Sequence, residues 1–165
     1  MKRLAKDEVF ARLAAEHRPG CRMCAMAVEQ DAIASTEHAV AVLDRFASRP
    51  GHVLVLLRRH EERIAALAWD EYADVQRLAW EMTRAIETAL APRRIYVAAL
   101  GSAAPLVTSF PHVHFHVVPL ADGGEADRPA AVFTWTNGIY VFDDADEEAA
   151  LVAKLRAAHA QRNQR

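Results

Sequence analysis

The sequence has no apolar run that approaches the roughly 18 residues of a membrane span. It also lacks a strong charge of either sign: the formal net charge is −2 at pH 7, which argues against a protein-wide cationic surface for nucleic acid. The first residues, MKRLAKDEVFARLAAEH, carry charges throughout and contain no apolar core of a secretory signal. We therefore expect a soluble, cytoplasmic protein that binds neither nucleic acid nor membrane.

Cysteine is scarce: the chain has 2, Cys21 and Cys24, in a Cys-x-x-Cys spacing. In a cytosolic chain such a pair favours a metal or redox site over a structural disulfide. Two thiolates supply half of a tetrahedral zinc site, so two further ligands are needed. A redox role would need a thioredoxin-like βαβ context, which the surrounding sequence does not show.

The length of 165 residues suits one domain, and we find no internal repeat or second-domain boundary, so residues 1–165 are taken as a single domain. We expect helices over 4–17 and 143–160, with a longer one between them. The apolar stripe of that long helix comprises Tyr72, Val75, Ala79, Met82, Ile86 and Ala89. Asp70 is its expected cap, and Pro92 ends it.

Short apolar runs predict the strands of an antiparallel α+β domain. They are AIAST, HAVAVLD, residues 52–57, residues 94–100 and the histidine-rich run 112–118. VFTW and IYVF flank TNG, and Asn-Gly favours a type I′ turn, so we also expect a C-terminal hairpin before the last helix. In that hairpin Trp135 and Tyr140 would either pack as ordinary cross-strand neighbours or form an aromatic wall for a base or sugar.

Three histidines occupy alternate positions in SFPHVHFHVVP. In a strand, residues two apart share a face, so His112, His114 and His116 would line one side. Unpaired imidazoles are costly on a core face, whereas imidazole serves as nucleophile, proton carrier or metal ligand. The spacing therefore indicates a functional face. The middle ring has a neighbour on each side that can orient it.

HVHFHVV resembles the His-x-His-x-His-x-x signature of the histidine triad (HIT) family, where x is hydrophobic. Over residues 21–119, other segments resemble successive parts of the family in the same order: CRMC, VAVLDRFASRPGHVLVLLRRH, the long helix and YVAALG. The resemblance implies a five-stranded antiparallel sheet with a long helix, with the core at about 21–120 and a C-terminal extension at 121–165. It also implies a homodimer that joins two sheets.

The resemblance further implies a nucleotide-binding hydrolase or transferase that cleaves next to an α-phosphate. His114 would attack phosphorus and form a covalent nucleotidyl–histidine, and His116 would contact the phosphate. His52 matches a histidine that supports the hydrogen-bond chain of the site, and Ser109 matches a Ser or Thr that touches phosphate. No catalytic cofactor is expected. Phosphoramidates and dinucleoside polyphosphates are the expected substrate classes.

Zinc-containing relatives and the galactose-1-phosphate uridylyltransferases complete the metal site with two histidines. By resemblance, the ligands here are Cys21, Cys24, His60 and His112, and the zinc is structural because four protein ligands leave no open position. Such an ion would also fix His112 and so aim the strand that carries His114.

The chain departs from the family pattern in the loop before the triad. GSAAPLVTSFP has Thr108 where a Gln is usual and Val107 where a Gly is usual, and Leu120 replaces the Arg after VVP. We assign Thr108, with Ser109, to substrate binding. The shorter Thr favours a second hypothesis, a nucleotide sensor with little chemistry. A third hypothesis treats the histidines as a catalytic metal cluster.

Overall fold

The computed structural model describes residues 1–16, 19–101, 110–121 and 123–163. A five-stranded antiparallel sheet forms its centre, in the order β2-β3-β4-β6-β5. The strands are β2 (Ala34–Ser35), β3 (Ala39–Leu43), β4 (Val53–Leu57), β5 (Arg94–Ala98) and β6 (His114–Leu120). The sheet confirms the predicted α+β class, and every predicted core strand is present.

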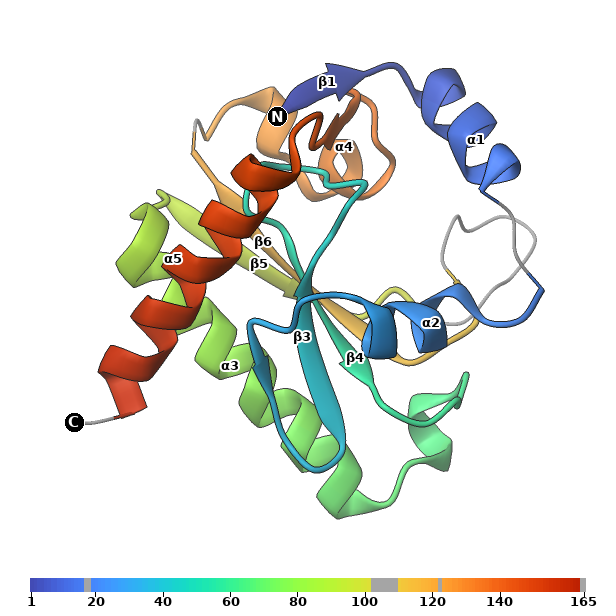
Figure 1. The fold of residues 1–165 in the computed structure, drawn as a ribbon, viewed down its shortest axis with the longest axis vertical. Coiled ribbons are helices and arrows are strands. Elements are labelled where there is room, and N and C mark those ends of the chain that lie inside the picture. Colours follow the sequence, from blue (N-terminus) through green and yellow to red (C-terminus); the bar gives the residue numbers. More distant parts are fainter. Residues whose placement is uncertain (17–18, 102–109, 122, 164–165) are drawn as a thin grey trace.

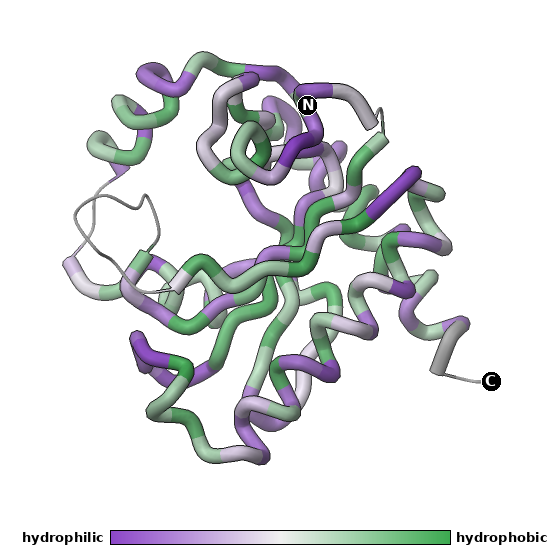
Figure 2. The backbone as a smooth tube through the Cα atoms, turned by 180° about the vertical axis from the view of Figure 1, so that it is seen from behind, coloured by the Kyte–Doolittle hydropathy of each residue, from purple (hydrophilic) through white to green (hydrophobic). Residues whose placement is uncertain are grey.

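One face of the sheet packs against α3 (Trp69–Leu90) and α5 (Ala145–Asn163), and the opposite face carries α2 (Arg22–Glu29) (Figure 1). Successive side chains of β6 point to opposite faces of the sheet. Val113, Phe115 and Val117 join the main core with α3, while His114 and His116 pair with Leu56 and Leu54, which pack toward α2. Figure 2 shows hydrophobic residues concentrated along the central strands.

The long helix follows its predicted stripe and ends before Pro92, with Ala91 in the left-handed conformation. The predicted cap was wrong: Asp70 lies in the first turn, and Ala68 occupies the cap position. The Ala68 backbone N–H donates instead to Glu71 Oε2 at 2.9 Å. A glutamate three residues into a helix can reach back to the first free amide, and this contact replaces the expected cap.

The two ends of the chain form a second, two-stranded sheet. β1 (Lys2–Leu4) pairs antiparallel with β7 (Ile139–Val141), and α1 spans Lys6–Ala15. The predicted helix over 4–17 is thus shorter, because buried Leu4 lies in β1 opposite Ile139. Figure 1 shows this sheet, α1 and α4 (Pro129–Phe133) together at one end of the molecule.

The predicted C-terminal hairpin was wrong. Val132 and Phe133 of VFTW lie in α4, which starts at Pro129, and β7 pairs with β1 instead of with this segment. Proline is well suited to the first position of a helix, and the N-terminal strand offers a pairing partner that local turn chemistry cannot reveal. Short 3₁₀ turns at Ile64–Ala66 and Glu125–Asp127 complete the elements. No helix in the described ranges is long and apolar enough to cross a bilayer.

Candidate metal and histidine site

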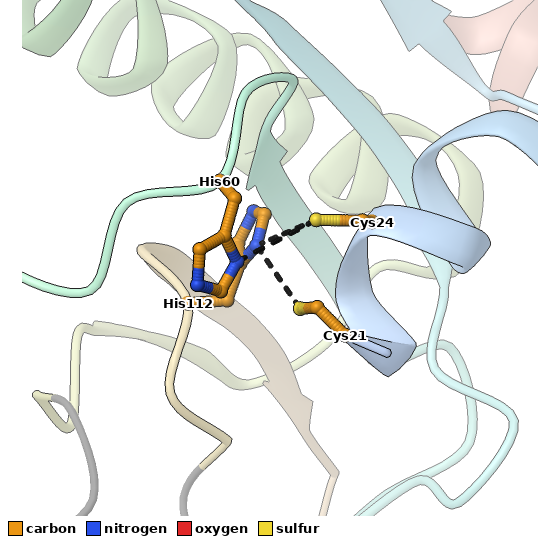
Figure 3. A group of neighbouring side chains, drawn as sticks. All are labelled: Cys21, Cys24, His60 and His112. Carbon is orange, nitrogen blue, oxygen red and sulfur yellow. Dashed lines mark hydrogen bonds between the residues drawn. The ribbon is translucent and has the colours of Figure 1, made fainter. Parts of the chain in front are cut away.

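Cys21 and Cys24 lie at the start of α2, a helix that the sequence analysis did not predict. Cys21 is the residue before its first turn, so Cys24 lies on the same side three positions later. His60 follows β4, and His112 precedes β6 by two residues instead of belonging to the strand. Figure 3 shows both sulfur atoms pointing toward the two imidazole rings.

The four predicted metal ligands converge, and their spacing suits one tetrahedral ion. His112 Nδ1 lies 3.4 Å from Cys21 Sγ and 3.5 Å from Cys24 Sγ, and His60 Nδ1 lies 3.6 Å from Cys24 Sγ. Bonds of about 2.3 Å to sulfur and about 2.0–2.1 Å to nitrogen at tetrahedral angles place such donors about 3.5 Å apart. The donor set therefore fits zinc in both chemistry and size.

A second hydrogen bond fixes the ring of His112. Its Nε2–H donates to the Leu57 carbonyl at 2.8 Å, so the lone pair lies on Nδ1, the nitrogen that faces the sulfurs. Burial raises the pKa of the Cys24 thiol, and the neighbouring Cys21 adds to this rise. Two adjacent thiolates repel each other, and a bound cation offsets that repulsion.

The middle histidine is oriented by the same residue. His114 is 4% exposed, and its Nδ1–H donates to the His112 carbonyl at 2.6 Å. This bond leaves the lone pair on Nε2. Burial lowers the pKa of His114, which favours the neutral ring. A neutral, oriented imidazole with a free lone pair is equipped for nucleophilic attack.

His116 and His52 form a hydrogen-bonded chain that ends at Asp44. His52 Nε2 lies 3.0 Å from His116 Nδ1, and His52 Nδ1 lies 3.1 Å from Asp44 Oδ2. The Ser48 backbone N–H also donates to His52 Nδ1, at 3.2 Å. His52 Nδ1 can donate to Asp44 or accept from Ser48 but not both, so the tautomer of His52 selects between these contacts, and the Asp44–His52–His116 relay is continuous when Nδ1 carries the proton. Burial lowers the pKa of His52 and, further, that of His116.

One nitrogen of the Asp44–His52–His116 chain has no partner among the described residues. His116 Nε2 is buried and makes no hydrogen bond to any described residue. An unpaired buried polar atom is costly, so it points to a ligand group that completes it. His114 and His116 both line a small cavity of about 40 Å³.

Asp44 was missed by sequence reasoning, although a signal existed. It follows β3 directly, and the register of β3 and β4 places it beside His52, where its backbone N–H donates to the His52 carbonyl at 2.9 Å. Reading that hairpin register would have paired the carboxylate with the histidine. The two predicted substrate-binding residues, Thr108 and Ser109, lie outside the described residues.

The HIT domain profile matches residues 26–123, more than half of the chain, and the protein belongs to this family. A curated relative, an uncharacterized HIT-like protein of Mycoplasma genitalium, is 32% identical over 94 residues, which cover 56% of this chain and 65% of that protein. The chain thus spans slightly less than two thirds of this relative's length.

Solved structures share the fold. A Zn-bound histidine triad family protein from Mycobacterium smegmatis has a TM-score of 0.67 at 23% identity, covering 88% of this chain and 96% of that one. A hypothetical histidine triad nucleotide-binding protein from Sulfolobus tokodaii has a TM-score of 0.68 at 17% identity, covering 86% and 93%. A uridylyltransferase mutant has a TM-score of 0.66 at 18% identity, covering 94% of this chain and 52% of that one.

Proposed function

We propose that the protein is a nucleotide-binding hydrolase or transferase that cleaves at the α-phosphate of a nucleotide conjugate. The orientation of His114 carries this proposal. Its Nδ1–H is held by the His112 carbonyl, so Nε2 offers its lone pair in a ring that lines the cavity. The substrate class is a nucleoside phosphoramidate or a dinucleoside polyphosphate. The relatives described as nucleotide-binding protein and uridylyltransferase support this class of chemistry.

The reaction takes two displacements at phosphorus. His114 Nε2 forms a bond to phosphorus as the bond to the leaving oxygen or nitrogen breaks, and the leaving group departs with those electrons and gains a proton. Water then attacks phosphorus, the bond to His114 breaks, and the free nucleotide leaves. The net reaction consumes one water and yields a nucleotide and the protonated leaving group. His116 Nε2 is the group available to contact the phosphoryl oxygens, and His52 positions His116.

We infer that Cys21, Cys24, His60 and His112 hold a structural zinc ion. Four protein ligands leave no open position for water, so the ion would supply stability and position, and no catalytic cofactor is needed. The link to the reaction is short. His112 offers Nδ1 to the metal position and its carbonyl to His114. A well-ordered His112 therefore fixes the orientation of the His114 ring.

We also propose a homodimer that forms through β5. This strand is the last in the sheet order, and its outer edge pairs with no strand of the described chain. Val97 on β5 is 47% exposed. An unprotected edge strand is a template for pairing with a second copy. Light scattering should give twice the monomer mass, and Val97→Lys should lower it toward the monomer; a monomeric wild-type protein would contradict the proposal.

Intact mass measurement tests the proposed chemistry directly. The protein is mixed with an adenosine phosphoramidate or a dinucleoside polyphosphate, and an adduct of one nucleotidyl group is expected on the wild-type chain and absent from His114→Asn. Release of the nucleotide is followed in parallel. Tight nucleotide binding without adduct or turnover across both substrate classes would contradict the enzyme and select the sensor hypothesis.

A further inference from the structure

Two adjoining cavities lie in front of the histidine strand. The small one, of about 40 Å³, is lined by His114 and His116, and the large one has a volume of about 940 Å³. Six residues line both of them: Leu13, Arg22, Met26, Arg45, Phe110 and Trp135. The shared walls make the small cavity the deep end of the large one.

The two cavities differ in size and chemistry. The small one has room for only a few water-sized groups, comparable to the oxygens of one phosphoryl group. Apart from the two histidines, the polar groups that line it are Asp44, Arg22 and Arg45. The large one is lined mainly by apolar and aromatic side chains: Phe10, Leu13, Met26, Phe110, Pro111 and Trp135. A ligand with a compact anionic group and a flat aromatic ring would match both cavities, with the anion in the small one and the ring in the large one.

Several residues of the large cavity lie outside the range matched to the family, and three of them have large apolar side chains. The matched range is 26–123, whereas Phe10 and Leu13 belong to α1, and Trp135 follows α4. The rings of Phe10 and Trp135 contact each other with their centroids 6.0 Å apart. The two chain ends, joined by the β1–β7 sheet, therefore build one aromatic wall of this cavity.

The backbone at Trp135 is unusual for so large a side chain. Its φ is +58°, in the left-handed region that bulky residues rarely adopt. Glycine would adopt this conformation without strain. This conformation ends α4, where the Thr136 N–H donates to the Ala131 carbonyl at 3.3 Å, and the choice of tryptophan at this position places an indole ring on the cavity wall.

We propose that Phe10, Leu13 and Trp135 form a specificity subsite for the aromatic heterocycle of the nucleotide whose phosphoryl group contacts His114 and His116. This inference rests on the proposed function and names the part of the substrate that the chain's own terminal segments select. Phe10 and Trp135 provide faces for stacking, and Leu13 closes the wall between them and the small cavity. Base–aromatic stacking tolerates any flat heterocycle, and a purine offers the larger face.

Two probes separate this subsite from the phosphate site: adenosine 5′-monophosphate (AMP) and ribose 5-phosphate, which lacks the base. Calorimetry should show that the wild-type protein binds AMP more tightly. Trp135→Ala should weaken AMP binding by about 5- to 150-fold, the range for loss of one stacking face, and should leave ribose 5-phosphate binding nearly unchanged. Trp80→Ala is the matched control, because Trp80 lies on α3 and is 56% exposed.

Two further measurements guard against a folding artefact. Phe10 is 40% exposed, so Phe10→Ala should fold normally and should still weaken AMP more than ribose 5-phosphate. The chain has 3 tryptophans, so Trp69→Phe with Trp80→Phe leaves Trp135 as the sole reporter, and AMP should change its emission while ribose 5-phosphate should not. Equal binding of both probes, or equal weakening of both by Trp135→Ala and Phe10→Ala, would overturn the subsite and leave the proposed function standing. Failure of the wild-type protein to bind either probe would overturn both.

Discussion

Two clusters of side chains lie beside the histidine strand, and histidine has a different task in each. In the Cys/His cluster (Cys21, Cys24, His60 and His112), donors of two kinds converge, with three nitrogen–sulfur distances of 3.4–3.6 Å. In the Asp/His chain (Asp44, His52 and His116), His52 Nε2 lies 3.0 Å from His116 Nδ1, and His52 Nδ1 lies 3.1 Å from Asp44 Oδ2. The bond made by the second nitrogen of each ring decides whether the first can hold a metal, move a proton or attack phosphorus.

The largest expected effect comes from His114, which belongs to neither cluster but receives its orientation from His112. His114→Asn removes the attacking lone pair, so turnover of a nucleoside phosphoramidate should fall by about 10³-fold or more. The metal cluster does not include His114, so zinc should stay bound. Product analysis and elemental analysis of the same samples measure both. Loss of the metal in this variant would favour the catalytic metal cluster, and an unchanged rate would remove His114 from the reaction.

Removing a sulfur ligand tests the Cys/His cluster without changing the Asp/His chain. Cys24→Ser should release zinc and lower stability by about 4 kcal/mol, the linkage value for a ligand present at 1,000 times its Kd. For a chain of this size that is about 8–16 °C in Tm. Turnover should also fall, because His112 loses one of its two anchors. Met23→Leu on the same helix is the control for repacking alone. A variant that unfolds at the wild-type temperature would show that the cluster holds no metal.

A smaller effect is expected at the relay. His52→Gln keeps the bulk of the side chain but breaks the link between Asp44 and His116. If His52 acts by positioning His116, kcat should fall by about 10- to 100-fold with little change in KM, and the nucleotidyl–His114 adduct should still form. Steady-state kinetics and intact mass together measure this. An equal loss in a variant of buried Ser48, such as Ser48→Ala, would indicate that local packing is responsible.

Local sequence patterns predicted the central sheet and the long helix well, although not α2, because each of those elements carries its own signal. The stripe on α3 and the alternation of Val113, Phe115 and Val117 on one face of the sheet repeat with the period of their element, so they could be read from neighbours in the chain. The second sheet could not be read in this way. Its strands, Lys2–Leu4 and Ile139–Val141, are three residues long and pair only across the full length of the chain.

The residues of the site also differ in whether local sequence reveals them. The histidines and cysteines can be recognised by residue type and spacing, and the structure brings six of the predicted residues into the two clusters: Cys21, Cys24, His60, His112, His52 and His116. Asp44 and Trp135 are ordinary residues that acquire importance only from their partners. The first is placed by the register of β3 against β4, and the second by the contact of α1 with the turn after α4. The hairpin register gave a signal for Asp44, whereas the contact that places Trp135 depends on tertiary packing and leaves no local pattern.

The smallest expected effect comes from a carboxylate remote from both clusters. Asp74 on α3 is 9% exposed and accepts hydrogen bonds from Thr36 Oγ1 at 2.5 Å, from the His38 backbone N–H at 3.0 Å and from Arg77. Desolvation raises the pKa of Asp74, but the bonds from Thr36 and Arg77 outweigh it, so the pKa lies below its ordinary value of 3.8. This charged acceptor ties the loop before β3 to the long helix.

Asp74→Asn keeps the shape and removes the charge, so it should cost about 1–3 kcal/mol of unfolding free energy at pH 7. A carboxyl whose pKa is lower in the folded state stabilises fully above its ordinary pKa and loses this contribution as pH falls through the folded value. The gap between wild type and variant should therefore be constant from pH 7 to about 5 and should shrink below about pH 4. Urea denaturation across this range measures it, and a gap that persists unchanged at pH 3 would mean that geometry, not charge, makes Asp74 stabilising. Because Asp74 contacts neither cluster, metal content and adduct formation should not change, which makes this variant the reference for the larger effects.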